Sequence, residues 1–459
     1  MKQVIHAIRL LLALVLLDKD VFAYPSKIQS DGQIVSVKTF GVKGDGQSDD
    51  AEALEKAMIY CIKNNRICFM PKTKNFYNIA STIRVSIEPG QSLRIVSNGA
   101  VIKPLMPPIN SSAYNLTLYK EHIFLSIGKQ IDILKEESFN KSENTSVKIK
   151  GLVFDGINLK EHFATTTFDT DIFIGLQILA ENVEVDKCLF RNIYGYGVRV
   201  HNVKYSTITN CKFDNVGGRG ATSFAQKIDR DAFGDGIYHA LVKSGGIIKI
   251  NNCIIRGKKA QNKRSRVAIT FEYSTQPYKI FLSNLEISGF AKCIHIEEVS
   301  PTIVHVDHVK MSDFNFGIAN VLNDKSAIYF NNTRLYTGFS DGNDAGDALA
   351  FLNYQSKAKI YVDSSILDFN GRQQAYQSAV GLAEVQNSTI NGHKTNFFFA
   401  GGNTVFSNCT FVDFGGTGIS FLGDSHVNYQ IIRSDVRKSS SIHARGQKLK
   451  LSINNAGIN

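Results

Sequence analysis

Val185-Asp-Lys-Cys188-Leu-Phe190 returns along the chain as Ile208-Thr-Asn-Cys211-Lys-Phe213 and as Ile250-Asn-Asn-Cys253-Ile-Ile255. Apolar and polar residues alternate in each copy, as in a β-strand with one face turned inward. The position of the Cys recurs at residues 188, 211, 253, 285, 309, 333, 365, 388 and 409. Copies without an insertion are 21 to 24 residues apart, and a period of this size indicates a solenoid.

This repeat predicts an all-β fold, a single-stranded right-handed parallel β-helix. The Asn before the Cys position should stack on its equivalents in neighbouring coils, with each amide bonding the next. A leucine-rich repeat has a similar period, but its fixed Leu spacing is missing. Four of the 7 Cys fall at the repeat position and are expected to be small buried residues rather than disulfide partners.

A Gly-rich turn and a short helix are expected near the start of the mature chain. Residues 35–60 read as a strand, a tight turn at Gly44-Asp45-Gly46 and a helix that Ser48, Asp49 or Asp50 can cap. We expect this helix to cover the open end of the solenoid. The acidic residues of the turn are expected to be structural.

The segment Phe40-Gly-Val-Lys-Gly-Asp-Gly-Gln-Ser-Asp-Asp50 closely resembles the opening of pectate-lyase-like β-helix proteins. That superfamily, related to the polygalacturonases, includes polysaccharide lyases, hydrolases, uronate epimerases and phage tailspike depolymerases. The resemblance implies the β-helix fold with an N-terminal capping helix. It implies little about the reaction, because function depends on the site carried by the fold.

The first residues have the composition of a secretory signal peptide. Lys2 and Arg9 precede the apolar run Leu10–Leu17, and cleavage is expected before Tyr24. We therefore expect a secreted or periplasmic protein with a signal peptide at 1–23 and one β-helix domain at 24–459. Within that domain we expect the cap at about 35–70, the coils at about 80–430 and then a basic C-terminal tail. No stretch has the length and apolarity of a membrane span.

The formal net charge is +11 and the isoelectric point is about 9.1. Such a charge favours acidic partners, and uronate-containing polysaccharides are the expected ones. Charge scattered over the coils for solubility is an equally good interpretation. No nucleic-acid-binding motif is present, so nucleic acid is not an expected partner. The sequence does not predict an oligomeric state.

Two inserted coils, between Cys211 and Cys253 and between Cys253 and Leu285, concentrate Asp, His, Tyr, Arg and Lys. Insertions in solenoids often gather on the binding face. The candidate catalytic residues are Asp235, Tyr238, His239, Arg266 and Tyr273. The candidate substrate-binding residues are Arg219, Asp231, Lys243, Arg264 and Glu272.

The segment Asp235-Gly-Ile followed by Asn252-Cys253 is similar to part of the polygalacturonase site, in which the first Asp and a later Asp pair act in catalysis. That Asp pair is missing here, and Lys263-Arg-Ser-Arg266 stands in its place. Arg binds carboxylates bidentately, so this replacement favours a lyase that neutralises a uronate.

In such an elimination, His239, Tyr238, Tyr273, Lys243 or an Arg would serve as base or acid. Asp235 or Glu272 would orient a partner or help to bind Ca²⁺, although no calcium-loop motif is visible.

The sequence therefore predicts an enzyme that cleaves acidic polysaccharide by β-elimination. A polygalacturonase-like glycoside hydrolase, a uronate epimerase and a non-catalytic glycan-binding or adhesion module remain alternatives. Structural interpretations also stay open for the candidate residues. Asp235 can belong to a plain turn, His239 to the surface or to a ladder, and Arg264 and Arg266 to a solvated turn.

Overall fold

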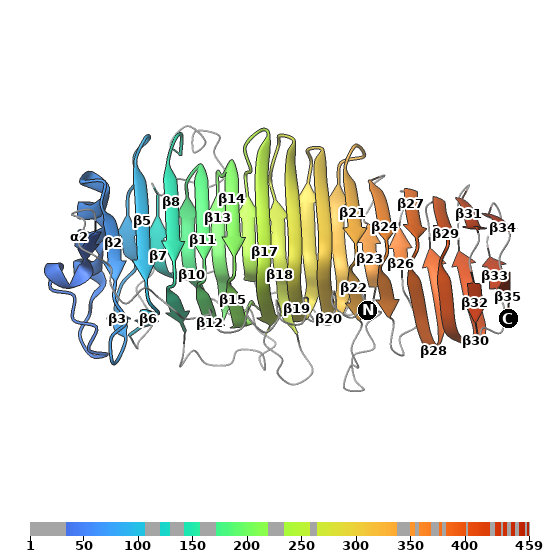
Figure 1. Ribbon diagram of the computed structural model, residues 1–459, viewed down its shortest axis with the longest axis horizontal. Helices are drawn as coiled ribbons and strands as arrows, with labels where there is room; N and C mark the ends of the chain where they lie inside the picture. The colour runs from blue at the N-terminus through green and yellow to red at the C-terminus, as the bar shows by residue number, and fades with distance from the viewer. Residues whose placement is uncertain are drawn as a thin grey trace, which may run out of the picture.

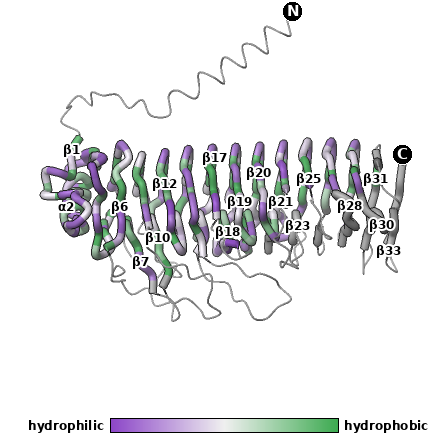
Figure 2. Tube along the Cα trace, turned by 90° about the horizontal axis from the view of Figure 1, so that it is seen from below, coloured by the Kyte–Doolittle hydropathy of each residue, from purple (hydrophilic) through white to green (hydrophobic). Residues whose placement is uncertain are grey.

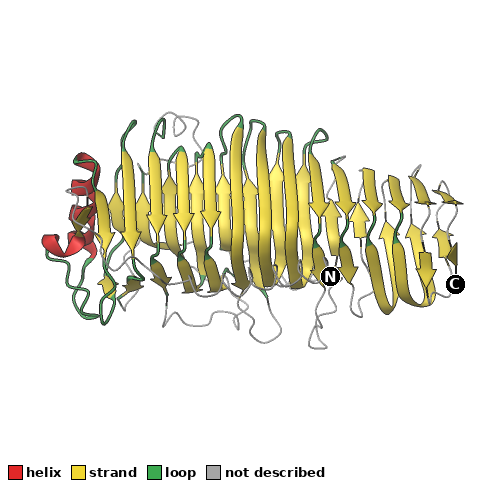
Figure 3. Cartoon of the chain, in the orientation of Figure 1, coloured by secondary structure: helices red, strands yellow, loops and turns green. Residues whose placement is uncertain are grey.

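The computed structural model describes residues 34–105, 120–128, 142–156, 171–218, 234–257, 264–336, 349–353, 358–368, 376–378, 382–400, 403–422, 427–432, 435–437, 442–445, 449–454 and 457–458. Strands dominate this part of the chain and stack into an elongated solenoid with a helix at one end (Figure 1; Figure 3). All the strand pairings are parallel, and each strand pairs with the equivalent strand of the next coil. The predicted single-stranded right-handed parallel β-helix is confirmed.

The pairings form three faces, and the long strands pass from one face to the next. The first face contains β1 (Ile34–Ser36), β2 (Ile67–Met70), β5 (Ser92–Ser97), β8 (Ser146–Lys150), β11 (Asn182–Asp186), β14 (Tyr205–Thr209), β17 (Gly246–Gly257), β19 (Tyr278–Glu298), β20 (Thr302–Leu322), β21 (Ala327–Asn331), β24 (Lys359–Asp363), β27 (Leu382–Gln386), β29 (Asn403–Ser407), β31 (Val427–Ile432) and β34 (Leu449–Asn454).

The second face contains later parts of β17, β19 and β20 together with strands that follow the Asn turn. These are β3 (Tyr77–Ile79), β6 (Val101–Pro104), β9 (Val153–Asp155), β12 (Leu189–Ile193), β15 (Lys212–Val216), β22 (Arg334–Tyr336), β25 (Ile366–Asp368), β28 (Thr389–Ala400), β30 (Thr410–Leu422), β32 (Asp435–Arg437) and β35 (Gly457–Ile458).

The third face contains the ends of β19, β20, β28 and β30. Its other strands are β4 (Ile83–Val85), β7 (Lys120–Ile127), β10 (Asp171–Leu179), β13 (Gly195–His201), β16 (Asp235–Ala240), β18 (Ser265–Glu272), β23 (Leu349–Asn353), β26 (Tyr376–Ser378) and β33 (Ile442–Arg445). Five of the ten candidate site residues lie in strands of this face: Asp235, Tyr238, His239, Arg266 and Glu272.

Apolar ladders fill the interior of the solenoid. Phe154, Phe190 and Phe213 occupy the same position in successive coils, with ring centroids 5.0 and 4.8 Å apart. Hydrophobic and hydrophilic residues are interleaved along the coils, as Figure 2 shows. Because adjacent strands lie only about 4.8 Å apart, like residues in register stack directly on one another.

Asparagine ladders define the turn between the first and second faces, as predicted. The side-chain amide of Asn252 donates to Asn210, and that of Asn210 donates to Asp186. Both Asn residues have positive φ values, 52° and 54°, a region that Asn tolerates better than most residues. Cys188, Cys211, Cys253 and Cys409 are buried and take part in no disulfide, which confirms their predicted role as small core residues.

The expected helix, α2 (Ala51–Lys63), lies at the N-terminal end of the solenoid beside a short 3₁₀ helix, η1 (Val37–Phe40). Its buried side includes Leu54, Ala57 and Met58. Asp50 does not cap the helix with its side chain. Its carboxylate instead accepts from the backbone N–H groups of Lys43 and Gly44 at 2.6 and 2.9 Å, so it fixes the Gly-rich turn.

The coils extend further than the sequence suggested. Strands β1 and β2 already pair before residue 80, and β32, β34 and β35 continue the pairing up to Ile458. Much of the expected basic tail therefore belongs to coil strands. The predicted signal peptide, residues 1–23, lies outside the described residues. Within the described part of the chain, no helix has the length and apolarity needed to cross a bilayer.

We expect Asn252→Ala to destabilise the protein more than Asn252→Gly. Both variants lose the amide bond to Asn210, but only Ala also carries the penalty of about 1 kcal/mol for a left-handed backbone. Thermal unfolding of the two variants beside the native chain checks this order. Equal or reversed melting temperatures would contradict the role assigned to the turn.

Candidate functional site

The outward side of the third face is unusually polar along β13, β16, β18 and the end of β19. The neighbours Val198, Val200, Ile269 and Phe271 belong to the interior core, so the residues alternating with them point outward. In-register pairing places Arg199, Tyr238, Thr270 and His295 in one outward row. A second row contains His201, Ala240, Glu272 and Glu297.

Asp235 and Arg266 form an ion pair on this face. Arg266 Nη1 lies 2.7 Å from Asp235 Oδ1, and the hydroxyl of Thr270 donates to Asp235 Oδ2 at 2.7 Å. The side chain of Asp235 is fully buried and that of Arg266 is 12% exposed. Buried charges need such partners, because removing one member leaves the other charge uncompensated.

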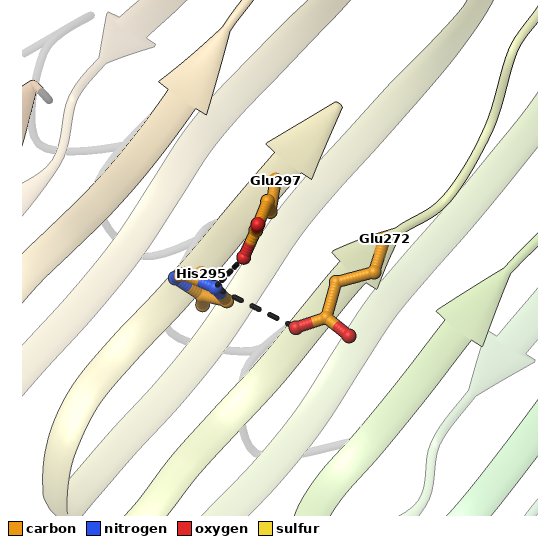
Figure 4. A group of neighbouring side chains, drawn as sticks. All are labelled: Glu272, His295 and Glu297. Atoms are coloured by element: carbon orange, nitrogen blue, oxygen red, sulfur yellow. Dashed lines mark ion pairs between the residues drawn. The ribbon is translucent and has the colours of Figure 1, made fainter. Parts of the chain in front are cut away.

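Glu272, His295 and Glu297 form a cluster beside this pair (Figure 4). His295 Nε2 lies 3.5 Å from Glu272 Oε1 and 3.4 Å from Glu297 Oε2. The hydroxyl of Tyr238 donates to the other oxygen of Glu272, Oε2, at 3.0 Å. Glu297 is the solvent-facing member, with 57% of its side chain exposed, whereas the side chain of Glu272 is 10% exposed.

The environment moves the pKa values of the two glutamates in opposite directions. Burial, and next the negative charge of Asp235, raise the pKa of Glu272 from 4.5 to about 7. The hydrogen bond from His295 lowers the pKa of Glu297. At neutral pH the protein therefore holds a carboxyl that is about half protonated next to an ionised one, which is a typical arrangement for acid–base catalysis.

A second buried ion pair lies in the neighbouring coils of the same face. Arg199 contacts both oxygens of Glu121 at 2.7 Å, and its guanidinium also donates to Gln177. Both side chains of the ion pair are almost completely buried. The face thus carries alternating carboxylates and guanidinium groups along the solenoid axis.

The structure brings together several of the predicted site residues. Asp235, Tyr238, Arg266 and Glu272 all lie on this outward face, within the contacts described above. Tyr273 directly follows β18 and is 53% exposed. Its pKa is raised by burial and then by Glu272 and Glu297, so it lies at the edge of the cluster.

The remaining predicted residues lie elsewhere. His239 points into the interior, where its ring stacks on Phe271 and its Nε2 contacts the hydroxyl of Ser206 at 2.9 Å. Burial lowers its pKa to about 3. The predicted catalytic role of His239 is therefore wrong, and the residue belongs to the interior core. Arg264 binds Asp313, and Lys243 lies 3.9 Å from Glu181. Arg219 and Asp231 lie outside the described residues.

Sequence reasoning missed Glu121, Arg199, His201, His295 and Glu297. They lie outside the two inserted coils, Glu121 far before them and the others just before or just after, and they carry no recognisable motif. The available signal for Arg199, His201, His295 and Glu297 was their register, because they occupy the outward rows in coils adjacent to Asp235 and Glu272. Glu121 lies two strands before Arg199 on the same face.

The cluster of Glu272, His295 and Glu297 is also the group among the described residues whose ligand atoms could hold a metal ion. These atoms lie within 4.8 Å of one another. A set that includes an imidazole nitrogen suits zinc or a similar transition ion better than Ca²⁺, which prefers oxygen ligands. The donor set therefore gives no specific support to Ca²⁺, which the sequence left open without predicting a definite cofactor.

No protein-family model and no curated protein sequence matches this chain. Solved structures resemble it in their right-handed parallel β-helix fold. The mannuronan C-5 epimerase A-module of Azotobacter vinelandii is 13% identical with a TM-score of 0.46, covering 92% of this chain and 99% of its own. The family 28 exopolygalacturonase of Yersinia enterocolitica is 12% identical with a TM-score of 0.46, covering 92% and 78%.

The surface adhesin PfbA of Streptococcus pneumoniae is 14% identical with a TM-score of 0.42, covering 87% of this chain and 91% of its own. At these identities and TM-scores the likeness concerns the fold.

The raised pKa of Glu272 predicts a pH-dependent cost in stability. Above the ordinary value of 4.5 the unfolded state ionises this group, whereas the folded state resists ionisation until about pH 7. The native chain should therefore lose roughly 2–3 kcal/mol relative to Glu272→Gln between pH 4.5 and pH 7. Urea unfolding of both proteins at pH 5 and pH 8 measures this difference.

Glu297→Gln is the matched control for this measurement. Because its pKa is lowered, Glu297 stabilises the folded state at pH values above the ordinary pKa of a glutamate, and this stabilisation is lost as the pH falls. Its contribution therefore changes with pH in the direction opposite to that of Glu272. A Glu272→Gln variant whose stability followed the same pH profile as the native chain would refute the assignment.

Proposed function

We propose that this chain is a polysaccharide-cleaving enzyme that hydrolyses glycosidic bonds by general acid–base catalysis. The observation that carries the proposal is the pair of glutamates with opposite pKa shifts, joined through His295 on an outward face of a β-helix. Glycoside hydrolysis needs two such carboxyl groups, one protonated and one ionised.

In the proposed reaction, Glu272 donates its proton to the glycosidic oxygen as the bond from that oxygen to the anomeric carbon breaks. Glu297 supplies the ionised carboxylate that attacks the anomeric carbon, because activating a water instead needs the two carboxyl groups about 6.5–9.5 Å apart. Water then cleaves the bond between Glu297 and the sugar, and Glu272, now ionised, accepts the proton from that water. The ligand atoms of the cluster lie within 4.8 Å of one another, so one glycosidic bond can be in reach of both groups. Tyr238 holds Glu272 by its hydrogen bond and acts as a positioning residue.

Elimination on a uronate polymer is the second candidate. It is favoured by the hydroxyl of Tyr238 and the imidazole of His295 beside Glu272, which provide groups for proton transfer. It also needs positive charge for the uronate carboxylate. Arg266 is already paired with Asp235, and Arg199 with Glu121, and for this reason we rank hydrolysis first.

One assay separates the candidates. The mature protein is incubated with polygalacturonate, alginate, hyaluronan, dextran and α-1,3-glucan, and both reducing ends and absorbance near 235 nm are followed. New reducing ends without absorbance indicate hydrolysis, and rising absorbance indicates elimination. Binding to a polymer without any product would support a glycan-binding module instead.

Replacing Glu272 by Gln should lower kcat about 100-fold or more, because the proton donor is lost. Glu298→Gln is the matched control. Glu298 is also a buried glutamate with a pKa of about 7, but it is bound to the hydroxyl of Tyr278 and the backbone N–H of Ser274. Its replacement should leave kcat unchanged, and equal losses in both variants would count against Glu272 as the acid.

Activity should decline as the pH rises through about 7, where Glu272 loses its proton. It should also decline in acid, below the ordinary range of a glutamate, where Glu297 becomes protonated. The hydrogen bond from Tyr238 lowers the pKa of Glu272, so Tyr238→Phe should move the alkaline limb of kcat/KM to higher pH. An unmoved alkaline limb in this variant would argue that another group titrates.

A further inference from the structure

The proposed site also brings three metal-binding groups together at the ends of two paired strands. Glu272 ends β18, and His295 and Glu297 lie two residues apart near the end of β19, so their side chains project from the same outward side (Figure 4). In the described part of the chain, this group has ligand atoms that all lie within 4.8 Å of one another. One imidazole and two carboxylates are ligands that zinc and similar transition ions accept.

The distances fit a metal centre better than a hydrogen-bonded triad. His295 Nε2 lies 3.5 Å from Glu272 Oε1 and 3.4 Å from Glu297 Oε2. Both separations exceed the usual range of an N–H···O hydrogen bond, which is about 2.7–3.2 Å. Ligands that surround zinc tetrahedrally at about 2.0–2.2 Å are themselves about 3.3–3.6 Å apart, and the observed spacing agrees with this value.

An ion can reach the group from the side of Glu297. The side chain of Glu297 is 57% exposed, whereas those of Glu272 and His295 are 10% and 8% exposed. The two buried ligands are fixed in their strands, and the exposed carboxylate can move toward them to complete the ligand set. Water can take the fourth position on the open side, as at zinc sites with three protein ligands.

The surroundings orient the ligands and suit a dication. Tyr238 donates to Glu272 Oε2 at 3.0 Å, so it holds this carboxylate while Oε1 is turned toward His295. Metal-ligating carboxylates are usually fixed by such outer hydrogen bonds. Two carboxylates balance the charge of one divalent ion, and the neighbouring Arg266 is paired with Asp235.

We propose that Glu272, His295 and Glu297 bind one divalent transition-metal ion of the zinc type, and that the bound ion inhibits hydrolysis. Binding releases to water any proton that Glu272 carries, because the metal ligates the ionised carboxylate. Both carboxyl groups are then occupied, so neither proton donation nor attack on the anomeric carbon is possible. The inhibition rests on the proposed function of the two glutamates, whereas the metal site does not.

Calorimetric titration of tag-free, EDTA-treated and dialysed protein with ZnCl₂ tests the site directly. We expect one zinc ion per chain. Glu297→Gln should weaken zinc binding by more than about tenfold, because even the loss of an outer partner costs a metal site about 10- to 100-fold. The replaced side chain is exposed, so the variant should remain folded, and its melting curve without metal checks this.

Asp307→Asn is the matched control. Asp307 Oδ2 lies 2.9 Å from His308 Nδ1, so this exposed pair also joins a carboxylate to an imidazole. No third ligand group accompanies it among the residues that the structure describes. The zinc affinity of this variant should equal that of the native chain. Ca²⁺ should not displace the bound zinc, because Ca²⁺ prefers a larger set of oxygen ligands.

The inhibition is measured on the panel polymer that the metal-free native chain cleaves. Saturating ZnCl₂ should abolish cleavage by the native chain and by Asp307→Asn, and excess EDTA should restore it in both. The visible spectrum of Co²⁺ bound in place of zinc reports occupancy of the same site without turnover.

The two parts of the proposal fail separately. Absence of zinc binding, binding that Glu297→Gln leaves unchanged, or equally tight binding of Ca²⁺ would overturn the metal site. Zinc bound at this site without loss of activity, or activity that requires zinc, would overturn the inhibition. If the metal-free protein cleaves no polymer of the panel, the proposed function fails and the inhibition with it, while calorimetry still decides the metal site.

Discussion

Parallel, in-register pairing between successive coils is the constraint on which the rest of this structure depends. Each residue has as its lateral neighbours only the residues at the same position in the coils before and after it. Inside, this rule produces phenylalanine and cysteine ladders, and at the turn it produces the asparagine ladder. On the third face it places Glu272 and Glu297 side by side. The ionisation state of a side chain there therefore depends mainly on the residues of the adjacent coils.

The same constraint explains how much could be predicted from sequence. The turn ladder repeats with a nearly fixed period, so the Cys and Asn positions were sufficient to predict the β-helix. The site was predicted in part, because Asp235, Tyr238, Arg266 and Glu272 lie in regular strands near one another in sequence. His239 was predicted to belong to the same site, but it directly follows Tyr238 in the strand. Adjacent strand residues point to opposite sides, so His239 points into the interior when Tyr238 points outward.

Sequence reasoning missed the residues whose spatial neighbours come from other coils, separated from them in the sequence by insertions. Only the register of strand pairing shows which of these residues are neighbours. Arg199 and Glu121 are 78 positions apart, yet their side chains form a bidentate ion pair. Insertions of unequal length between coils hide which residues share a row, and no local motif marks them. Burial strengthens the attraction between the two charges but also removes their hydration, and both effects belong to the folded face and not to either segment.

A perturbed pKa does not by itself identify a functional group in this fold. Glu272 and Glu298 both have pKa values of about 7 for the same first reason, burial. Glu298 accepts from Tyr278 and from the backbone of Ser274, so its bonds connect it only to neighbouring strand and turn groups. Glu272 instead faces His295 and an exposed, ionised Glu297. What distinguishes the site is therefore the array of neighbours that the coils place in register around one carboxyl group.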